Sequence, residues 1–249
     1  MRFFVGLHHC HVAGNFDAAF ISVNAIRGRK SPFPARDWIM DSGAFTTIAK
    51  YHGYPHPVSE YAAQIRRWKD NGNLLAAVSQ DYMCEPHMLA LTGLTVADHQ
   101  RLTIERYDAL VAENTGVYIM PVLQGYSPGE YRSHIKQYGD RLKPGLWVGV
   151  GSVCKRNSTN LFAVWMVLDT IKEERPDLLL HGFGLKKTAL KETFIRELLH
   201  SADSMAWSFA ARREGRNAND WREAQRYSDN IDRLCAPRGQ LSLFNWADL

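Results

Sequence analysis

The sequence predicts an α/β fold, a single (β/α)8 TIM-like barrel, because eight short apolar runs alternate with amphipathic stretches. Most of these runs are continuous rather than alternating in polarity, as expected for parallel strands buried on both faces. The length of 249 residues is close to the usual size of such a barrel. A doubly wound open sheet is the competing architecture. No linker, repeat or low-complexity segment divides the sequence, so we expect one domain over residues 1–249.

The expected strands are short and separated by polar segments. In chain order they are Phe3–Leu7, Phe20–Ala25, Trp38–Met40, Leu75–Ser79, Tyr118–Leu123, Trp147–Val150, Leu178–Gly182 and Met205–Ser208. The connection between the first two is too short to hold a full crossover helix, and it is the weakest part of the strand count.

The expected helices have apolar residues at helical spacing. They are Ser59–Asp70, Val96–Glu113, Pro128–Tyr138, Leu161–Glu174 and Thr188–Leu199, with a closing C-terminal helix at about 217–235. Ser127, Pro128 and Glu130 have the pattern of an N-cap, a first-turn proline and a capping-box acid. In the closing helix, Arg222 and Arg226 lie one turn apart, where they either contact phosphates or form a solvated face.

Composition places the chain among ordinary globular proteins, with 45% hydrophobic and 22% charged residues. No apolar run is long enough to span a bilayer, and polar residues follow Met1 too soon for a secretory signal. We therefore expect a cytoplasmic protein, which means the host cytoplasm if a phage encodes it.

The four cysteines, Cys10, Cys84, Cys154 and Cys235, form no C-x-x-C pair, so we expect free thiols and no zinc motif. The run His8–His11 contains three histidines and a cysteine. Neighbouring strand residues point to opposite faces, so only alternate members of this run could share a metal. Packing and hydrogen bonding are the alternative, and we expect no metal site.

The net charge is +4, which is compatible with a nucleic-acid partner. The cations gather in three short clusters, each placed after an expected strand. We expect the clusters to border one face of the barrel and contact phosphates, although solvated loops are the alternative. The expected nucleic-acid contacts are Arg27, Arg29, Lys155, Arg156, Arg212, Arg213 and Arg216, with Lys30 beside the first cluster.

Three aspartates stand at the ends of expected strands. Asp41 follows W-I-M, Asp81 closes L-L-A-A-V-S-Q-D, and Asp203 precedes the expected strand Met205–Ser208. Any one of them alone reads as a helix cap or a turn acid. Together, at the face where parallel barrels keep their chemistry, they predict an acid/base or nucleophilic site.

Amides and glycines follow the same strands. Gln124 and Gly125 end P-V-L-Q-G, and Gly149 and Gly151 lie in V-G-V-G-S. Glycines let a flat ligand approach the backbone, while carboxylates and amides offer the paired donors and acceptors that recognise a purine-like edge. V-G-V-G-S lacks the third glycine and the acidic ribose partner of a dinucleotide fingerprint.

The ordered set D-S-G-A-F, S-Q-D, V-L-Q-G, V-G-V-G-S, H-G-F-G and A-D-S-M-A-W resembles the tRNA-guanine transglycosylase superfamily. Within it, the chain is most similar to the short, mostly phage-borne DpdA-type enzymes, which exchange guanine in DNA for a 7-deazaguanine. The resemblance runs from about Phe3 to Asn217. It implies a barrel enzyme without a cofactor, acting on DNA and a free 7-deazaguanine base such as preQ0.

The resemblance also implies roles for individual residues. Asp203 matches the aspartate that attacks the anomeric carbon, and Asp41 matches the general acid/base. Asp81, Gln124 and the backbone of Gly149 match groups that hold the base edge. The remaining residues expected at the base are Ser42, Gly125 and Gly151. A carboxylate that traps oxocarbenium character is chemically reasonable here, as in retaining glycosidases.

One feature departs from the tRNA-acting members. They carry a three-cysteine, one-histidine zinc site after the nucleophile, where this chain has A-A-R-R-E-G-R-N-A. The difference favours DNA, with the target base flipped out of the duplex or presented on a single strand. The alternatives are a tRNA-guanine transglycosylase, a barrel hydrolase of free nucleosides, and a catalytically silent nucleic-acid-binding barrel.

Overall fold

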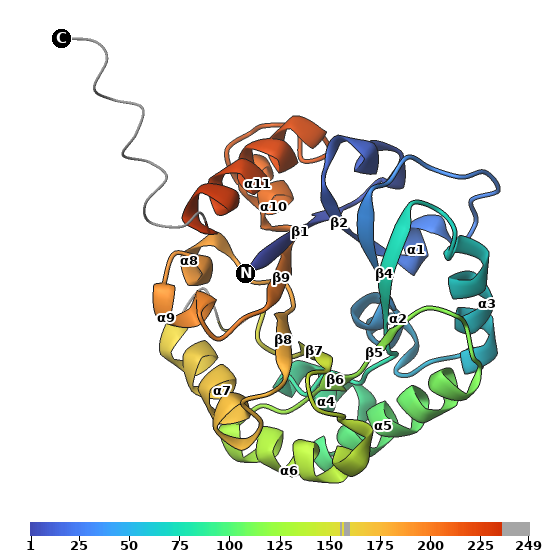
Figure 1. Ribbon diagram of the computed structural model, residues 1–249, viewed down its shortest axis with the longest axis vertical. Coiled ribbons are helices and arrows are strands. Elements are labelled where there is room, and N and C mark those ends of the chain that lie inside the picture. The colour runs from blue at the N-terminus through green and yellow to red at the C-terminus, as the bar shows by residue number, and fades with distance from the viewer. Residues whose placement is uncertain (155, 157–159, 236–249) are drawn as a thin grey trace.

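The computed structural model describes residues 1–154, 156 and 160–235. Within them, nine parallel strand segments form one sheet in the order β5-β4-β3-β2-β1-β9-β8-β7-β6, and helices surround it (Figure 1). The segments are β1 (Arg2–Leu7), β2 (Ala18–Ser22), β3 (Asp37–Asp41), β4 (Asn73–Val78), β5 (Ile119–Met120), β6 (Val122–Leu123), β7 (Trp147–Val150), β8 (Leu179–Gly182) and β9 (Ser201–Ser204).

The two edges of this sheet belong to one stretch of chain. β5 pairs with β4, β6 pairs with β7, and only Pro121 separates β5 from β6. Proline has no N–H to donate to a ladder, but its carbonyl still accepts from the N–H of Gly149 at 2.9 Å. The sheet therefore curves round into a TIM-like barrel, which confirms the predicted fold class and excludes the open doubly wound sheet.

The described helices follow the strands around the barrel. They are α1 (Val23–Ile26), α2 (Ala44–Tyr51), α3 (Val58–Trp68), α4 (Pro86–Thr92), α5 (Val96–Ala112), α6 (Pro128–Tyr138), α7 (Leu161–Glu174), α8 (Lys187–Leu190), α9 (Thr193–Arg196), α10 (Ala206–Arg213) and α11 (Trp221–Cys235), with 3-10 turns η1 (Cys10–Asn15) and η2 (Gly139–Arg141). The short turn η1 takes the place of the first crossover helix.

Helix caps explain why the longer helices start where the sequence predicts. Ser127 and Glu130 form a capping box at the start of α6, with Pro128 in its first turn. Thr95 and Asp98 form the same motif at the start of α5. Each box satisfies backbone N–H groups that the first turn would otherwise leave unpaired, so local sequence alone sets these boundaries.

Buried tyrosines fasten the helices to the ends of the strands. The hydroxyl of Tyr61 on α3 donates to the carbonyl of Val78 at 2.9 Å. On α6, Tyr131 donates to the carbonyl of Gly151 at 2.6 Å, and Tyr138 donates to that of Val122 at 3.1 Å. Each ring also buries apolar surface, worth roughly 2 kcal/mol per side chain. The strand ends that carry the polar residues are thus rigidly held.

The barrel interior is a separate, smaller core than the layer between strands and helices. Phe4, Ile39, Val78, Met120 and Val122 pack together inside it. Side chains alternate along a strand, so the residue two positions after an inward one also faces inward. Asp41, at the end of β3, therefore follows Ile39 into the interior. Asp203 pairs in register with Phe4 and shares its face.

Three predicted elements are wrong in extent or type. The strand expected at Met205–Ser208 is part of a turn and of α10, and the strand is the polar S-A-D-S of β9, whose residues are all buried. The strand expected at Phe20–Ala25 begins at Ala18 and turns into α1 after Ser22. The single helix expected at Thr188–Leu199 is the pair α8 and α9.

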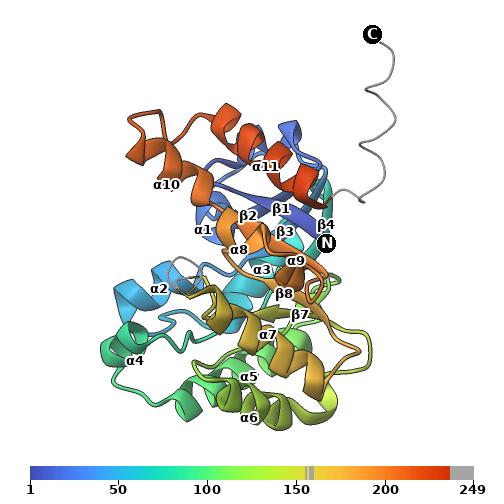
Figure 2. The same cartoon turned by 90° about the vertical axis from the view of Figure 1, so that its left-hand side faces the viewer.

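The carboxyl ends of the strands lie on one side of the molecule. Figure 2 shows the N-terminus of β1 on the right and α1, α2, α4 and α10 on the left, where the chain leaves β2, β3, β4 and β9. Among the described residues, no helix combines the length and the apolar character that crossing a bilayer requires.

Candidate active site

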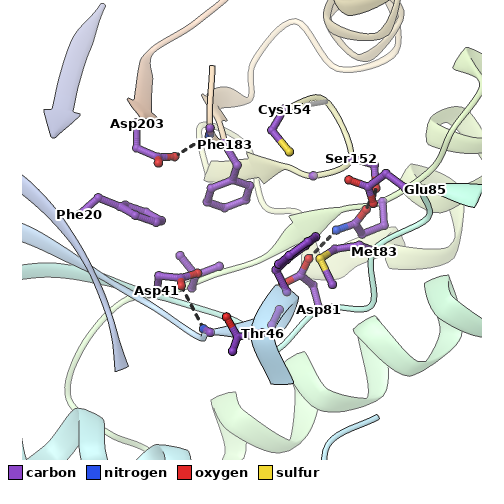
Figure 3. Close-up of a pocket in the computed structure, with 17 residues that line it drawn as sticks. Phe20, Asp41, Thr46, Asp81, Met83, Glu85, Ser152, Cys154, Phe183 and Asp203 are labelled. Carbon is purple, nitrogen blue, oxygen red and sulfur yellow. Dashed lines mark hydrogen bonds between the residues drawn. The ribbon is translucent and has the colours of Figure 1, made fainter. Parts of the chain in front are cut away.

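A pocket of about 220 Å³ opens among the carboxyl ends of the strands. Its lining combines four carboxylic side chains with aromatic rings and small residues. Figure 3 shows Asp203 and Asp41 on one side, near Phe20, and Glu85 and Ser152 on the other, with Asp81 between. The lining residues are Phe20, Asp41, Gly43, Ala44, Phe45, Thr46, Val78, Asp81, Met83, Glu85, Gln124, Gly151, Ser152, Cys154, Phe183, Gly184 and Asp203.

Asp203 is held by two donors at the end of β9. Its Oδ1 accepts from the backbone N–H of Gly184 at 3.0 Å and lies 3.3 Å from Nε2 of His181. Only 5% of the residue is exposed. Both contacts use Oδ1, so the second carboxylate oxygen is engaged by neither of these donors.

His181 is oriented from behind by two further side chains. The indole N–H of Trp147 donates to Oγ of Ser201 at 2.7 Å, and that Oγ lies 2.9 Å from Nδ1 of His181. An indole can only donate, so the Ser201 hydroxyl proton is left for Nδ1. With Nδ1 accepting from Ser201, Nε2 of His181 carries the hydrogen that is donated to Asp203. This buried chain fixes the nucleophile candidate in one orientation.

Asp41 ends β3 and precedes α2. Its Oδ2 accepts from the backbone N–H of Gly43 at 3.1 Å, and Gly43 has a φ of 71°, a conformation that glycine adopts without strain. Burial raises the pKa of Asp41 to about 6; the Gly43 N–H opposes this shift and the charge of Asp203 adds to it. A carboxyl group with such a pKa can both give and take a proton near neutrality.

Asp81 lies just beyond β4, and burial raises its pKa to about 7. The side-chain amide of Gln124 donates to Oδ2 of Asp81, which opposes the shift, while the charges of Asp41 and Glu85 add to it. The pair Asp81 and Gln124 presents a carboxylate and an amide side by side. This is the donor and acceptor arrangement that reads the edge of a purine.

Two glycines, Gly149 in β7 and Gly151 directly after it, make room for neighbouring side chains. A Cβ at position 151 would lie 2.1 Å from Nε2 of Gln124, so only glycine lets this amide occupy its place. A Cβ at position 149 would lie 2.3 Å from the ring of Phe183. Gly149 therefore stands behind Phe183 rather than against the pocket.

Aromatic rings that the sequence analysis did not select line the pocket. Phe20 on β2 and Phe183 after β8 have ring centroids 6.0 Å apart, and Phe20 stacks on His181 at 5.6 Å. Flat apolar walls of this kind suit a planar ring. Glu85 and His181 were also missed. Apart from H-G-F-G and the closeness of Glu85 to Asp81 in sequence, no signal marks these four residues.

The structure brings together five of the eight residues expected at the catalytic and base sites: Asp41, Asp81, Gln124, Gly151 and Asp203. The other three do not line this pocket. Ser42 faces a neighbouring cavity, Gly149 lies behind Phe183, and the Cα of Gly125 faces α6. Sequence proximity to a catalytic residue misled the prediction for Ser42, because its side chain points to the opposite face from Asp41.

The expected phosphate contacts are spread over several elements on the side where the strands end. Arg27 is exposed and lies 3.8 Å from Glu60, while Arg29 donates to the carbonyls of Ser31 and Pro32. Arg212 and Arg213 are exposed on α10. Arg216 is paired with Glu214 and Glu223. Lys155 lies outside the described residues.

Arg156 is anchored beside the pocket. Its Nε donates to the carbonyl of Ser152 at 2.9 Å, a second nitrogen lies 3.4 Å from the carbonyl of Gly125, and the guanidinium covers the ring of Tyr126. These contacts hold a positive charge and an exposed aromatic face together at the pocket's edge.

The histidine run near the N-terminus engages in packing. Nε2 of His8 lies 2.7 Å from Oγ of Ser208, and the ring of His8 packs edge-on against Trp207. His9 and His11 stack at 5.6 Å. In the part of the chain that the structure describes, no three His, Cys, Asp or Glu side chains are grouped as a metal ion would require.

The profile of the family DpdA, "DeoxyPurine in DNA protein A", matches residues 4–220. A comparison with curated proteins gave no match. The matched segment includes β2 to β9, most of β1 and all four acids of the pocket. The chain belongs to the DpdA family, a transglycosylase-related family whose members modify DNA with 7-deazaguanines.

Proposed function

We propose that this DpdA-family protein is a base-exchange transglycosylase, which replaces guanine in DNA by a 7-deazaguanine through a covalent aspartyl-glycosyl intermediate. The observation that carries the proposal is one pocket that holds Asp203 and Asp41 together with Asp81 and its hydrogen-bonded partner Gln124. Cleavage of a glycosidic bond needs a nucleophile and an acid, which Asp203 and Asp41 would supply. Recognition of a guanine edge needs paired donors and acceptors, which Asp81 and Gln124 would supply.

In the first half-reaction, a carboxylate oxygen of Asp203 bonds to C1′ of the deoxyribose while the bond from C1′ to the base breaks. The electron pair of that bond leaves with guanine, and protonated Asp41 gives its proton to the departing base. The carboxylate stabilises the oxocarbenium character that develops at C1′. His181 and Gly184 hold Asp203 in place, because both bond to the other oxygen.

In the second half-reaction, the ionised Asp41 takes the N9 proton of the incoming 7-deazaguanine, such as a preQ0-like base. N9 then bonds to C1′ and Asp203 leaves as a carboxylate. The nucleotide does not become abasic, because the incoming base and not water attacks C1′ of the intermediate. A pKa of about 6 for Asp41 suits both steps, since one group must serve first as acid and then as base.

The bases are expected to lie against the wall that Phe20 and Phe183 form, with their Watson–Crick edge toward Asp81 and Gln124. The carboxylate of Asp81 accepts from N1–H and the 2-amino group. The amide of Gln124 donates to the 6-oxo group. Guanine and 7-deazaguanine share this edge, so one pocket can hold the leaving and the entering base in turn.

DNA is the proposed polymer, with the target base flipped out of the duplex or unpaired. A second cavity near the active pocket carries cations that could contact the phosphates of the DNA backbone. It is about 850 Å³ in volume, lies between α8, α10 and α11, and is lined by Lys186, Lys187 and Arg213 beside the exposed ring of Phe209. These lysines follow β8 and add to the cations identified from the sequence.

The direct test is base exchange with purified protein and radiolabelled guanine or a 7-deazaguanine. We expect label to exchange with guanine in duplex or single-stranded DNA, and the Asp203→Asn variant to be inactive. Exchange confined to tRNA would show that RNA and not DNA is the substrate, and the proposed base-exchange reaction would still hold. Release of base from free nucleosides without DNA would indicate a hydrolase, and binding without exchange in any substrate would indicate a silent barrel.

A further inference from the structure

A cavity of about 210 Å³ lies directly beside the active pocket, on the other side of α2. We call it the Ser42 cavity. Asp41 and Thr46 line the active pocket, whereas the residue that follows each of them, Ser42 or Thr47, lines this cavity. The Ser42 cavity therefore begins one residue away from the proposed general acid/base.

The lining of the Ser42 cavity includes buried polar groups. Ser42 is 3% exposed, and its Oγ has no hydrogen-bond partner within the described part of the chain. The hydroxyl of Tyr54 is close by, but it donates to the carbonyl of Asp81 at 3.0 Å. Oε1 of Gln80 accepts from Arg106 at 2.7 Å, and the amide N–H groups of Gln80 have no acceptor among the described residues. Unpaired buried donors are costly for a protein alone, so they point to a ligand.

The same cavity has an aromatic ring and a cation in the exposed part of its lining. Tyr51 is 51% exposed, and Nζ of Lys50 lies 4.8 Å from the centre of its ring. Arg27 is exposed and lies 3.8 Å from Glu60, the acid of this lining. A ring, cations and unpaired donors together suit a nucleotide, which has a flat base, polar edges and a phosphate.

The cavity of about 850 Å³ between α8, α10 and α11 lies on the other side of the active pocket, and we call it the Phe209 cavity. Helix α10 forms one wall of it and begins three residues after Asp203; Figure 2 shows α10 on the same side of the molecule as α2. Phe209 is 59% exposed, and Lys187 and Arg213 line the same cavity. The acid of this lining, Glu214, pairs with a neighbouring arginine.

We propose that these two cavities hold the nucleotides on either side of the target guanine, so that the enzyme acts on a DNA strand whose neighbouring bases are also unpaired. The nucleotide beside Asp41 places its base in the Ser42 cavity. The nucleotide beside Asp203 stacks its base on Phe209. The inference rests on the proposed function, because it starts from the strand that Asp203 would attack.

The positions of the two cavities decide between duplex and unpaired DNA. Base flipping takes only the target out of a duplex, and its neighbours stay stacked and paired in the helix. Bases held in this way cannot enter cavities on two sides of the pocket. Proteins that bind single strands combine cationic grooves with aromatic rings on which successive bases stack, and both cavities have this combination. The substrate class is therefore a single strand or an opened duplex.

Ser42 and Gln80 also give the enzyme a preference for one neighbouring base. Both side chains can donate a hydrogen bond, which suits an exocyclic carbonyl oxygen. Thymine, cytosine and guanine have such an oxygen, and adenine has none. At one of the two positions next to the target, adenine should therefore slow base exchange by about three- to tenfold, the effect of losing one hydrogen bond.

The test measures the uptake of radiolabelled guanine into one oligonucleotide that contains a single guanine. The oligonucleotide is offered as a single strand, as a full duplex, and as a duplex with a three-base bubble centred on the guanine; the target strand is then recovered on a denaturing gel. Exchange on the single strand and on the bubble should be at least about tenfold faster than on the duplex. A second series varies the base before and the base after the guanine.

Three variants separate the two cavities from the active pocket. Ser42→Ala should remove the discrimination against adenine and leave the melting temperature unchanged, because the lost hydroxyl has no partner among the described residues. Tyr51→Ala and Phe209→Ala should each weaken binding of the single strand by about fivefold to a hundredfold. All three should bind the free base as the wild type does, an effect that general damage to the fold would not spare.

The matched control is Phe194→Ala on α9. Phe194 is 46% exposed, and its neighbour Thr193 lines a cavity with Met1, which precedes β1 at the amino ends of the strands. This variant should bind the single strand as tightly as the wild type. A loss as large as that in Phe209→Ala would overturn the assignment of Phe209 as a stacking platform.

The remaining outcomes distinguish this inference from the proposed function. Equal exchange on the three forms of DNA, or a preference for the neighbouring base that Ser42→Ala does not change, would overturn the inference and leave base exchange in place. A wild-type protein that exchanged guanine in none of the three forms would contradict the proposed function itself.

Discussion

At the scale of single residues, the site depends on how each carboxyl group is held. Asp203 has two donors on one oxygen, Asp41 has the N–H of Gly43, and Asp81 has the amide of Gln124. The sequence predicted Asp41 and Asp81 from their positions at strand ends, and Asp203 from its place before an apolar run that is helical in the structure. It could not reveal Glu85 or His181, because their importance comes from partners that only folding brings near, such as Ser152 and Ser201.

Replacement of the nucleophile candidate gives the first prediction. Asp203→Asn keeps the size of the side chain and the contacts with His181 and Gly184, but an amide does not attack C1′. We expect base exchange to fall by about 10⁴-fold or more, with no covalent protein–DNA adduct on denaturing gels. An unchanged melting temperature controls for folding. Undiminished exchange would remove Asp203 from the mechanism.

The second prediction separates the two other acids. Asp41→Asn should lower kcat by about a hundredfold or more, because positioned proton transfer is lost, with little change in KM for the base. Asp81→Asn should mainly raise KM for the base and alter base choice. Steady-state kinetics with each variant distinguishes these effects. Equal defects in both parameters would refute the division of roles.

The third prediction concerns stability and pH. The folded pKa of Asp81, about 7, lies above its ordinary value, so the native protein binds more protons than the unfolded chain between roughly pH 4 and 7. The stabilising contribution of this group is complete below that window and is lost as pH rises through about 7. The free energy of unfolding, measured by chemical denaturation from pH 5 to 8, should therefore decline in the wild type. This decline should be smaller in the Asp81→Asn variant. A decline as steep as in the wild type would contradict the shift.

At the scale of elements, the helices and strands that the sequence predicts correctly are those with clear capping residues or a clear apolar pattern. α6 and α7 begin and end at the predicted residues, because each has an N-cap side chain and an apolar face. β9 was missed because Ser201, Asp203 and Ser204 are polar yet buried, and their hydrogen bonds with distant side chains cannot be read from local composition. The apolar residues that follow them form α10, which packs its own buried face.

The end of β7 carries the fourth prediction. Gly151→Ala places a methyl group where Gln124 now lies, so the amide must move away from Asp81. We expect base affinity to fall at least about tenfold while the barrel stays folded. The matched control is Gly129→Ala on α6, where an added Cβ meets nothing within 4 Å. Equal base affinity in both variants would show that the position of Gln124 does not matter.

At the scale of the whole molecule, charge and shape bear on the polymer. Cations that follow α1 and cations on α8 and α10 lie where the strands end, on the same side as the pocket. Four of the expected arginines already have partners within the protein, which their positions in the sequence could not show; they are Arg27, Arg29, Arg156 and Arg216. Exposed ion pairs are weak, so phosphates can compete for these side chains.

The fifth prediction tests this surface. DNA binding should weaken steeply as salt rises, and Arg212→Ala with Arg213→Ala should reduce the slope of log affinity against log salt by about one to two. Arg141→Ala is the control, because Arg141 precedes β7 and lies at the opposite ends of the strands. Fluorescence anisotropy with duplex DNA measures the affinity and its dependence on salt. Folded tRNA added as a competitor shows which polymer is preferred. Salt-independent binding, or equal slopes in all variants, would exclude this face as the phosphate contact.

The pairing of β1 with β9 also has a consequence for folding. β1 begins at Arg2, β9 begins at Ser201, and Phe4 is directly opposite Asp203. During translation, β1 cannot pair with β9 until nearly the whole barrel has left the ribosome. Contacts between segments so distant in sequence also form slowly. Asp203, the proposed nucleophile, enters the pocket only when β9 pairs with β1, so an incompletely synthesised chain has an incomplete pocket.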